Sequence, residues 1–372
     1  MSVAIVTTTI NVPRLFEGYC QDFLKHGHKD VIFIVIGDQK TPREVEQYCK
    51  SLQQQYGYLF EYYDVDRQRS YLRRFPQLAA YLPYNSVQRR NIGLLRAYEM
   101  GVDVIVTVDD DNYLFELDLL RHHKLVGTTI TLPSFGSSVG WFNPCQFLSA
   151  DPPVAFYHRG FPMSQRRASC TVKQGVRKGR LAVNVGLWIG DPDVDAWVRM
   201  TMALNCDKWR GTGNFTLDPD TWAPFNSQQT ALARDLLPTY FLNPNAGRYD
   251  DIWASYTVQR IAGHMGDLVS FGSPIVDHRQ QRSWASLWRD LDDERMGALL
   301  TDEFVCALRS LHLTGTSYSE CYAEFIDHLD ARSRNNEEGT RGGEEFLREY
   351  VQGMRMWAHI FDMLDGSGAY AW

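Results

Sequence analysis

Short apolar runs alternate with amphipathic segments over the first third of the chain. Three runs have the length and continuity of buried strands: Val3–Thr8, Val31–Ile36 and 102–108. Residues 14–26 have apolar positions at helical spacing, and residues 85–98 predict a second helix. Between them, the sequence T-P-R-E predicts a capped helix start with Thr41 as N-cap and Pro42 in the first turn. Because strands that alternate with helices form parallel units, the pattern predicts an α/β fold with helices on both faces of a sheet.

Polar residues follow each of the three predicted strands. Thr8 and Thr9 end the first strand, Asp38 follows the second, and the run 109–112 (D-D-D-N) follows the third. Ligands of such sheets gather at the carboxyl ends of the strands. We therefore expect these residues to line one binding site.

Beyond residue 112 the pattern is less regular. Residues 113–285 are rich in Gly, Pro and Trp, which suits loops and short strands that build an acceptor side over the sheet. Residues 284–311 predict a helix, and residues 330–345, with paired glycines and many charges, predict a linker. We therefore expect a catalytic domain over 1–285 and a helical region over 286–372.

The last predicted helix has an apolar stripe. Its members recur at helical spacing: Phe346, Leu347, Tyr350, Val351, Met354, Trp357, Phe361 and Leu364. Such a stripe packs either on its own domain or against a second copy of the chain. Both alternatives, including a homo-oligomer, stay open at this point.

Composition narrows the class of protein. The 372 residues are 44% hydrophobic and 22% charged, which excludes a disordered or collagen-like chain. The formal net charge of -7 offers no general attraction for nucleic acid or an anionic membrane. No apolar stretch approaches the ~20 residues of a membrane helix, and no leader pattern precedes the first strand. The seven cysteines are scattered without a C-x-x-C pair, so we expect a cytoplasmic protein without nucleic-acid or membrane partners.

Three consecutive carboxylates give the strongest chemical signal. Asp109, Asp110 and Asp111 end a predicted buried strand, where they repel one another unless a cation or hydrogen-bond donors neutralise them. Mn²⁺ or Mg²⁺ prefers such oxygen ligands and also bridges to a diphosphate. His278 follows a short predicted strand and is a further candidate ligand of the metal.

Three other stretches supply groups that such a site lacks. Arg90 lies in Q-R-R-N-I-G, where a helix can direct guanidinium groups at phosphates. Residues 158–167 form a basic loop interrupted by Gly and Pro, and residues 247–253 contain the pair Asp250 and Asp251 at a predicted helix start. One of these two carboxylates can cap the helix, which leaves the other free to act on a substrate.

Several motifs together resemble the reversibly glycosylated polypeptides, the family of UDP-arabinopyranose mutases. They occur in the family's order: V-T-V-D-D-D-N, R-G-F-P-M-S-Q-R, G-L-W-I-G-D-P-D-V-D-A, G-R-Y-D-D-I-W-A and S-P-I-V-D-H-R. The resemblance runs from the N-terminus to about residue 285. It implies a GT-A-like (Rossmann-like) nucleotide-diphospho-sugar fold with a mixed central sheet, followed by C-terminal helices. It also implies a metal-dependent isomerase that interconverts the pyranose and furanose forms of a nucleoside diphosphate (NDP) sugar.

The resemblance assigns roles by matching position. For the nucleotide and diphosphate it implies Arg90, Asp109 and Asp110, to which the positions at strand ends add Thr8, Thr9 and Asp38. For Mn²⁺ or Mg²⁺ it implies Asp109, Asp111 and His278. Arg159 matches the arginine that becomes glycosylated, and Arg166, Asp250 and Asp251 complete the expected catalytic set. The sugar side comprises Gly186, Trp188 and Gln229.

Departures from the family pattern leave the substrate open. Asn112 stands where plant members have Cys, Asn184-Val185 replaces Ser-His, and Gln229 replaces an Asn. The base and sugar are therefore those of either a UDP-L-arabinose or a GDP-L-fucose type of substrate.

The expected chemistry begins at the anomeric carbon, because a pyranose ring cannot open while C1 bears phosphate. The C1–O bond must break first, and capture of C1 by Arg159 would then allow ring opening and closure through O4. Asp251 is the candidate carboxylate for activating the protonated guanidinium. Two alternatives remain from the sequence: a glycosyltransferase that uses the same metal site with a separate acceptor, and a non-catalytic subunit that binds sugar nucleotides.

Overall fold

A mixed β-sheet runs through the computed structural model, which describes residues 1–280, 282–334 and 343–366. Four parallel strands in the order β3-β2-β1-β4 form its first part: β1 (Val3–Thr8), β2 (Val31–Ile36), β3 (Leu59–Tyr63) and β4 (Val104–Val108). The order then continues β11-β8-β6-β10-β12-β5, and β11 lies antiparallel to both β4 and β8. The parallel arrangement expected from the apolar runs therefore holds only as far as β4, and the mixed central sheet of the expected α/β fold class is confirmed.

The second part of the sheet brings distant residues to the end of β4. Its strands are β5 (Asn112–Leu114), β6 (Thr129–Ser137), β7 (Leu148–Asp151), β8 (Val172–Gly190), β9 (Asn205–Trp209), β10 (Phe215–Leu217), β11 (Gln229–Ala233) and β12 (Leu268–His278). β12 lies parallel to β8 and antiparallel to β5. The register of β5 and β12 pairs His278 with Asn112, so the end of β12 lies beside the acidic run that follows β4.

Helices cover the parallel strands as the alternating pattern predicts. They are α1 (Leu15–Lys25), α2 (Glu44–Tyr56), α3 (Val65–Leu72), α4 (Pro76–Tyr81) and α5 (Arg90–Glu99), the last preceded by the 3₁₀ turn η1 (Val87–Arg89). Gly93 allows α5 to approach the sheet closely, because a Cβ atom there would lie 2.5 Å from Cγ1 of Val6. The end of η1 and the start of α5 are thereby held against the strand ends.

The predicted N-cap role of Thr41 is wrong. α2 begins at Glu44, and no side chain caps its N-terminus. The hydroxyl of Thr41 instead donates to the carbonyl of Thr9 and accepts from the backbone N–H of Asp38, each at 2.6 Å. It thus joins the ends of β1 and β2, because both termini offer unpaired backbone groups there.

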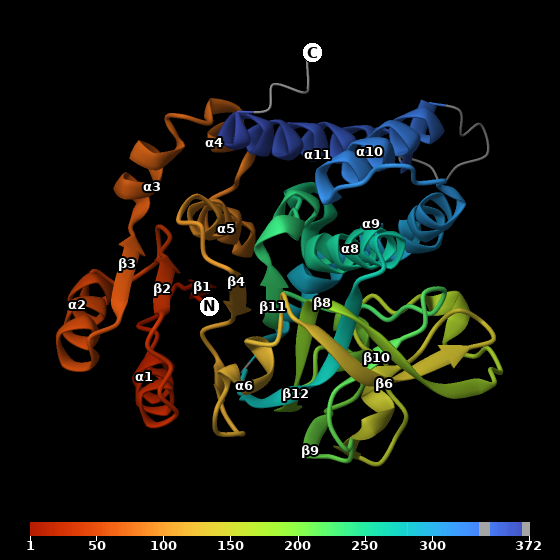
Figure 1. Cartoon of the computed structure of the whole chain (residues 1–372), viewed down its shortest axis with the longest axis horizontal. Coiled ribbons are helices and arrows are strands. Elements are labelled where there is room, and N and C mark those ends of the chain that lie inside the picture. The colour runs from red at the N-terminus through yellow and green to blue at the C-terminus, as the bar shows by residue number, and fades with distance from the viewer. Residues whose placement is uncertain (281, 335–342, 367–372) are drawn as a thin grey trace.

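The helices of the C-terminal part of the chain, from α8 (Asp250–Met265) to α11 (Gly343–Asp365), lie together in the upper half of the view in Figure 1. The remaining helices are α6 (Leu120–His123), α7 (Ala196–Thr201), α8 (Asp250–Met265), α9 (Trp284–Ser310), α10 (Tyr318–Arg334) and α11 (Gly343–Asp365). Short 3₁₀ turns are η2 (Pro144–Phe147), η3 (Met163–Gln165), η4 (Arg234–Thr239) and η5 (Pro244–Tyr249). Among the described helices, none combines the length and apolar character that a membrane crossing requires.

The apolar stripe of α11 packs on the rest of the same chain. Trp357 is fully buried, its ring stacks on Phe241 with centroids 4.9 Å apart, and its indole N–H donates to the carbonyl of Leu237 at 3.2 Å. Tyr350 similarly contacts Trp253 of α8. Of the two alternatives for the stripe, the structure favours packing on its own chain. The linker predicted over 330–345 falls partly outside the described residues, and the domain boundary at 285 stays a prediction.

We expect Trp357→Ala to lower the free energy of unfolding by about 3–5 kcal/mol, because it leaves a large cavity under α11. Urea unfolding followed by circular dichroism measures this. The matched control is Met363→Ala on the same helix, whose side chain is half exposed and whose loss is expected to change stability by at most about 0.5 kcal/mol. A smaller particle in light scattering with unchanged stability would instead assign the stripe to a contact between copies.

Candidate functional site

A cavity of about 600 Å³ lies at the carboxyl ends of the parallel strands. Six of the residues expected at the nucleotide and metal line it together: Thr8, Thr9, Asp38, Asp109, Asp110 and Asp111. Cavities of roughly 300–1,000 Å³ are typical of sites for small molecules. The residues that follow the parallel strands thus lie in one place, as expected from their position in the sequence. Their roles there stay predictions.

Two of these carboxylates hold the loops that shape the cavity. Asp110 accepts hydrogen bonds from the hydroxyl of Thr9 at 2.5 Å and from the amide of Asn11 at 3.3 Å. Burial raises the pKa of Asp110, and hydrogen bonding to Thr9 opposes that rise. Asp38 accepts from the backbone N–H groups of Gln39 and Ser86. The contacts of Asp110 with Thr9 and Asn11, and of Asp38 with Ser86, join loops that are more than 45 residues apart in the chain.

Arg90 lies beneath the cavity and does not line it. Its guanidinium forms an ion pair with Asp109 and donates to the carbonyl and the hydroxyl of Ser227, both at 2.7 Å. The expected contact with a diphosphate would therefore require Arg90 to act through Asp109 or to exchange partners. Arg279 does line the cavity, and its side chain is 63% exposed. Arg279 lies in the S-P-I-V-D-H-R motif, next to His278, but no spacing or charge pattern distinguished it from other surface arginines.

The antiparallel pairing of β5 with β12 brings Asp111 and His278 together. Nε2 of His278 lies 3.4 Å from Oδ2 of Asp111, and Nδ1 lies 2.5 Å from the backbone carbonyl of Asp191. That carbonyl can only accept, so Nδ1 carries a hydrogen and Nε2 faces the carboxylate. Burial lowers the pKa of His278, but the hydrogen bond and charge of Asp111 raise it overall.

These two residues fit a divalent metal better than Asp109 does. Oδ1 of Asp111 is buried without a hydrogen-bond partner in the described structure, whereas Asp109 is already paired with Arg90. Within residues 1–280, 282–334 and 343–366 no group of three His, Cys, Asp or Glu side chains could hold a metal by itself. One carboxylate and one imidazole suit Mn²⁺ or Mg²⁺ when phosphate oxygens and water complete the shell.

A second centre forms around Arg159, which is only 6% exposed. Nε and Nη2 donate to the two oxygens of Asp193, each at 3.0 Å. Nη1 and Nη2 donate to Oδ1 of Asp251, each at 3.1 Å, and Nη1 also contacts the carbonyl of Arg248. Burial opposes the charge of Arg159, but the two carboxylates raise its pKa well above the ordinary value. Burial likewise opposes ionisation of Asp193, but Arg159 holds the pKa of that carboxyl well below its usual range.

Asp193 and Asp195 were not predicted as site residues. Both stand in the quoted G-L-W-I-G-D-P-D-V-D-A motif, where three acidic residues at alternate positions were the available signal. Asp195 accepts from Arg166 at 2.5 Å and from the backbone N–H of Gly160 at 3.2 Å. Arg166 also donates to the carbonyl of Phe161, so it braces the loop that carries Arg159.

The Asp pair at the start of α8 divides between two sets of contacts. Asp251 faces Arg159, whereas Asp250 accepts from the amide of Gln88 and from the backbone N–H of Asp251, both at 2.8 Å. Burial, followed by the negative charge of Asp251, raises the pKa of Asp250 to about 7. The first helical turn thus positions one carboxylate that pairs with a cation and one that can exchange a proton near neutral pH.

Hydrogen bonds join the two centres through the segment before β11. Ser227 accepts from Arg90 and donates its backbone N–H to Asp251 at 2.9 Å. Asn226 donates to Asp193 at 2.7 Å, and Gln228 donates to Asn112 at 3.0 Å. No sequence pattern singled out residues 226–228. The resulting network runs from the acidic end of β4 to the Arg159 centre.

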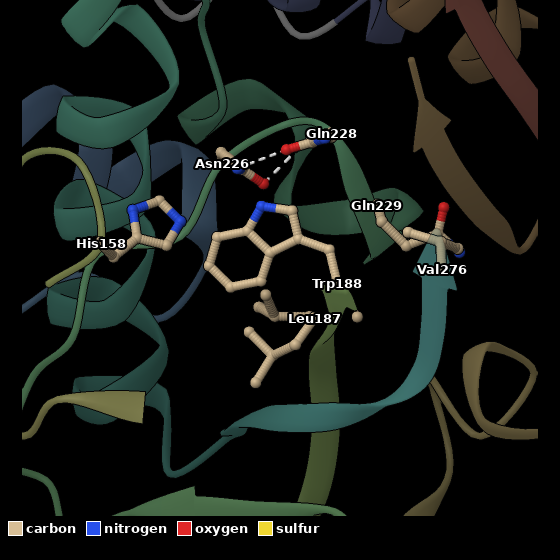
Figure 2. Close-up of a pocket in the computed structure, with 9 residues that line it drawn as sticks. His158, Leu187, Trp188, Asn226, Gln228, Gln229 and Val276 are labelled. Carbon is tan, nitrogen blue, oxygen red and sulfur yellow. Dashed lines mark hydrogen bonds between the residues drawn. The ribbon is translucent and has the colours of Figure 1, made fainter. Parts of the chain in front are cut away.

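The expected sugar residues meet at a small pocket beside this network (Figure 2). Gly186, Trp188 and Gln229 line it together with His158, Asn226 and Gln228. Its cavity volume of about 10 Å³ is close to what one water molecule needs. A Cβ atom on Gly186 would lie 2.6 Å from Cγ of Gln229, so glycine leaves room for that side chain.

The sequence of this chain matches a known protein family. A family model described as "Reversibly glycosylated polypeptide" matches residues 92–365. UDP-arabinopyranose mutase 3 of Arabidopsis thaliana is 26% identical over 234 residues, which are 59% of this chain and 59% of that protein. Probable UDP-arabinopyranose mutase 2 of Solanum tuberosum is 25% identical over 278 residues, 71% of this chain and 68% of that protein. The match thus spans less than two thirds of the Arabidopsis protein.

Similarities to solved structures are weaker. Glucosyl-3-phosphoglycerate synthase from Mycobacterium tuberculosis matches with a TM-score of 0.43 and 12% identity over 81% of this chain and 79% of that one. A mannosyltransferase from Pyrobaculum calidifontis matches with a TM-score of 0.32 and 10% identity over 99% of this chain and 76% of that one. We draw no conclusion about function from similarities at this level.

We expect Asp111→Ala and His278→Ala each to weaken Mn²⁺ binding in the presence of UDP or GDP by about 10–100-fold, because each removes one ligand of the pair. Electron paramagnetic resonance of free Mn²⁺ measures this binding. Asp66→Ala is the control, since that side chain lies on the surface. Nucleotide binding that is indifferent to chelator and to both variants would contradict the metal assignment.

The raised pKa of Asp250 predicts a pH dependence of stability. The folded protein binds this proton up to about pH 7, whereas an unfolded Asp releases it near pH 4, so stability falls as the pH rises between these values. Asp250→Asn should remove that part of the fall, measured as unfolding free energy in urea at pH 5 and pH 8. Asp66→Asn is the control at an exposed site. Equal pH dependence in Asp250→Asn and the unmodified protein would contradict the assignment.

Proposed function

The chain belongs to the reversibly glycosylated polypeptide family, and from this premise we propose that it is an isomerase that interconverts the pyranose and furanose forms of an NDP-sugar. The observation that carries the proposal is the continuous network of hydrogen bonds and ion pairs from Asp109 through Arg90, Ser227 and Asp251 to Arg159. It links a cavity suited to a nucleotide with a charged centre suited to a reacting sugar.

The nucleotide end uses the cavity at the strand ends. Thr8, Thr9 and Asp38 would contact the nucleoside. Arg279 also lines the cavity, and its exposed guanidinium would bind the diphosphate. Asp111 and His278 would hold Mn²⁺ or Mg²⁺, with Asp109 beside them. When bound, that ion would stabilise the negative charge of the departing diphosphate. UDP-L-arabinose and GDP-L-fucose are the two substrate types that we carry forward.

The sugar end uses the Arg159 centre. Because Arg159 is held protonated, it is a poor nucleophile until a carboxylate accepts one of its protons. Asp193, whose pKa lies well below the usual range, supplies a permanent counter-charge, which leaves Asp251 as the proton acceptor. The geometry thereby offers an activated guanidine without an unpaired buried charge.

In the proposed mechanism, Asp251 holds and returns each proton that the bond changes release. The C1–O bond breaks with its electron pair leaving on the NDP, a nitrogen of Arg159 bonds to C1, and one guanidinium proton passes to Asp251. The ring oxygen then leaves C1 with the proton from Asp251. The 4-hydroxyl adds to C1 and returns a proton to Asp251. Finally the NDP oxygen displaces the nitrogen, which regains that proton, and the furanose is released.

A glycosyltransferase remains the competing reaction, and an acceptor-free assay separates the two. The protein is incubated with Mn²⁺ and either UDP-L-arabinopyranose or GDP-L-fucose, and the products are separated by chromatography. A mutase yields a new isomeric peak of unchanged mass, whereas a transferase yields only slow hydrolysis to NDP and free sugar. Hydrolysis without the isomer would contradict the proposal.

We expect Arg159→Lys and Arg159→Ala to lose isomerisation by roughly 10³-fold, because lysine lacks the planar fork that engages both carboxylates. Asp251→Asn should fall similarly. Affinity for UDP or GDP should change little, since the nucleotide cavity lies at the other end of the network. Arg167→Ala, at an exposed position of the same loop, is the control and should retain turnover.

Mass spectrometry of protein quenched during turnover tests the covalent step. One added sugar on the peptide that contains Arg159 is the expected result. Near-normal turnover by Arg159→Ala would overturn the mechanism. An unmodified peptide, with activity still lost in Arg159→Lys, would replace the covalent step by a purely positioning role.

A further inference from the structure

The Q-R-R-N segment, where η1 meets α5, contains a buried side chain to which the proposed reaction gives no role. Arg90 of this segment pairs with Asp109, whereas the nearby Gln88 reaches Asp250 at the start of α8. Gln88 belongs to η1 and is 8% exposed. A buried amide needs partners for both its oxygen and its NH₂ group, so the contacts of Gln88 show what it joins.

The partners of Gln88 fix the direction of its amide. Nε2 donates to the carbonyl of Gly247 at 3.1 Å and to Oδ2 of Asp250 at 2.8 Å. Because a carbonyl can only accept, the NH₂ group must lie on this side. Oε1 accepts from the hydroxyl of Ser86, and the backbone N–H of Gln88 donates back to that hydroxyl at 3.2 Å. The two ends of one amide thus join Ser86 to the start of α8.

Ser86 belongs to the wall of the nucleotide cavity. Asn85, Ser86 and Val87 line that cavity together with Asp38. The backbone N–H of Ser86 donates to Oδ2 of Asp38 at 3.2 Å, so the two residues move together. A ligand that contacts either of them therefore acts on the hydroxyl that holds Gln88.

At its other end, Gln88 holds one member of the carboxylate pair. Oδ1 of Asp250 accepts from the backbone N–H of Asp251 at 2.8 Å, and Asp251 in turn contacts Arg159 at 3.1 Å. Burial, followed by the charge of Asp251, raises the pKa of Asp250 to about 7, and the hydrogen bond from Gln88 opposes that rise. Further titratable groups interact with Asp250 from the surrounding elements: Arg159, Tyr240 and Tyr350. Loss of the bond from Gln88 would therefore change both the position and the proton affinity of Asp250.

This connection is separate from the one through Ser227. Ser227 bonds to Arg90 and to Asp251, whereas Gln88 bonds to Ser86 and to Asp250. Removal of the Gln88 amide leaves the bonds of Ser227 in place. The two connections can therefore be tested apart.

We propose that Gln88 is a positioning residue that links the nucleotide cavity to the pair Asp250 and Asp251. A nucleotide bound against residues 85–87 sets the position of Asp250 through Gln88, and Asp250 sets that of Asp251 beside Arg159. The inference rests on the proposed function, since it takes the cavity as the place of the nucleotide. Such a link completes the sugar end only when the NDP is held, which limits loss of the sugar to water.

Spectra of ¹³C-labelled carboxyl groups, with Asp250→Asn for assignment, test the link without turnover. Gln88→Met keeps the length of the side chain and removes both ends of the amide. We expect it to raise the pKa of Asp250, because a hydrogen bond that favours the charged form is lost. Saturating UDP or GDP should shift the Asp250 signal in the unmodified protein but not in Gln88→Met. Gln77→Met, at an exposed position of α4, is the matched control.

A second variant cuts the same link without removing a buried side chain. Ser86→Ala, at a half-buried position, takes away the hydroxyl that holds Oε1 but leaves the donor to Asp250. We expect it to keep the pKa of Asp250 and to lose the response of the Asp250 signal to UDP or GDP. An unchanged pKa of Asp250 in Gln88→Met, or an intact nucleotide response in both variants, would overturn the link.

Turnover separates positioning from binding. We expect Gln88→Met to lower kcat for isomerisation about tenfold, because the carboxylates beside Arg159 lose their alignment, while KM and the affinity for UDP or GDP change by less than about twofold. Equal losses of kcat and of nucleotide affinity would show that Gln88 serves only the fold. If the unmodified protein binds neither UDP nor GDP and isomerises neither NDP-sugar, the proposed function itself fails. Normal isomerisation by Gln88→Met rejects only the link.

Discussion

A guanidinium withdrawn from water is the constraint on which the site depends. Arg159 is buried, and the desolvation of its charge is offset only because Asp193 and Asp251 surround it with good geometry. Loss of one partner of such a pair costs about 3–5 kcal/mol, because the other charge then stays buried and unpaired. Folding therefore requires three segments to meet: the loop 158–167 with Arg159, the residues before α7 with Asp193, and the start of α8 with Asp251.

Other features follow from that meeting point. Gly160 has a positive φ of 77° and packs against Ile252, so the loop can turn directly above the first turn of α8. Asp195 closes the same loop by binding Arg166 and the backbone of Gly160. Ser227 ties Asp251 to Arg90, whose own buried charge is paired with Asp109. Two buried cations, each with its own carboxylate, thus hold the nucleotide end and the sugar end in a fixed relation.

The same arrangement separates acid–base roles among carboxylates that look alike in the sequence. Asp193 is kept ionised by Arg159, whereas Asp250, one residue from Asp251, has a pKa raised to about 7 by burial and by its neighbour's charge. Asp111 keeps an unpaired oxygen beside His278, whereas Asp109 is neutralised by Arg90. Environment, rather than residue type, distinguishes these groups.

Local patterns in the sequence determined the elements and one edge of the site. The apolar runs predicted β1 and β2 at their observed bounds. The positions of Thr9, Asp38 and Asp110 after parallel strands predicted that these residues lie around one cavity. The quoted motifs marked Arg159 and Asp251, which the structure places in contact. Periodicity can reveal these because it reflects which face of one strand or helix is buried.

Only the tertiary structure decided which residues became partners. Thr41 joins two strand ends instead of capping α2, Arg90 pairs with Asp109 beneath the cavity, and His123 reaches Gln229 across more than 100 residues of chain. Asp193 and Ser227 entered the network because β8 and β11 lie side by side in the sheet. Strand order and the pairing of buried charges depend on contacts between segments far apart in sequence, and no local spacing encodes them.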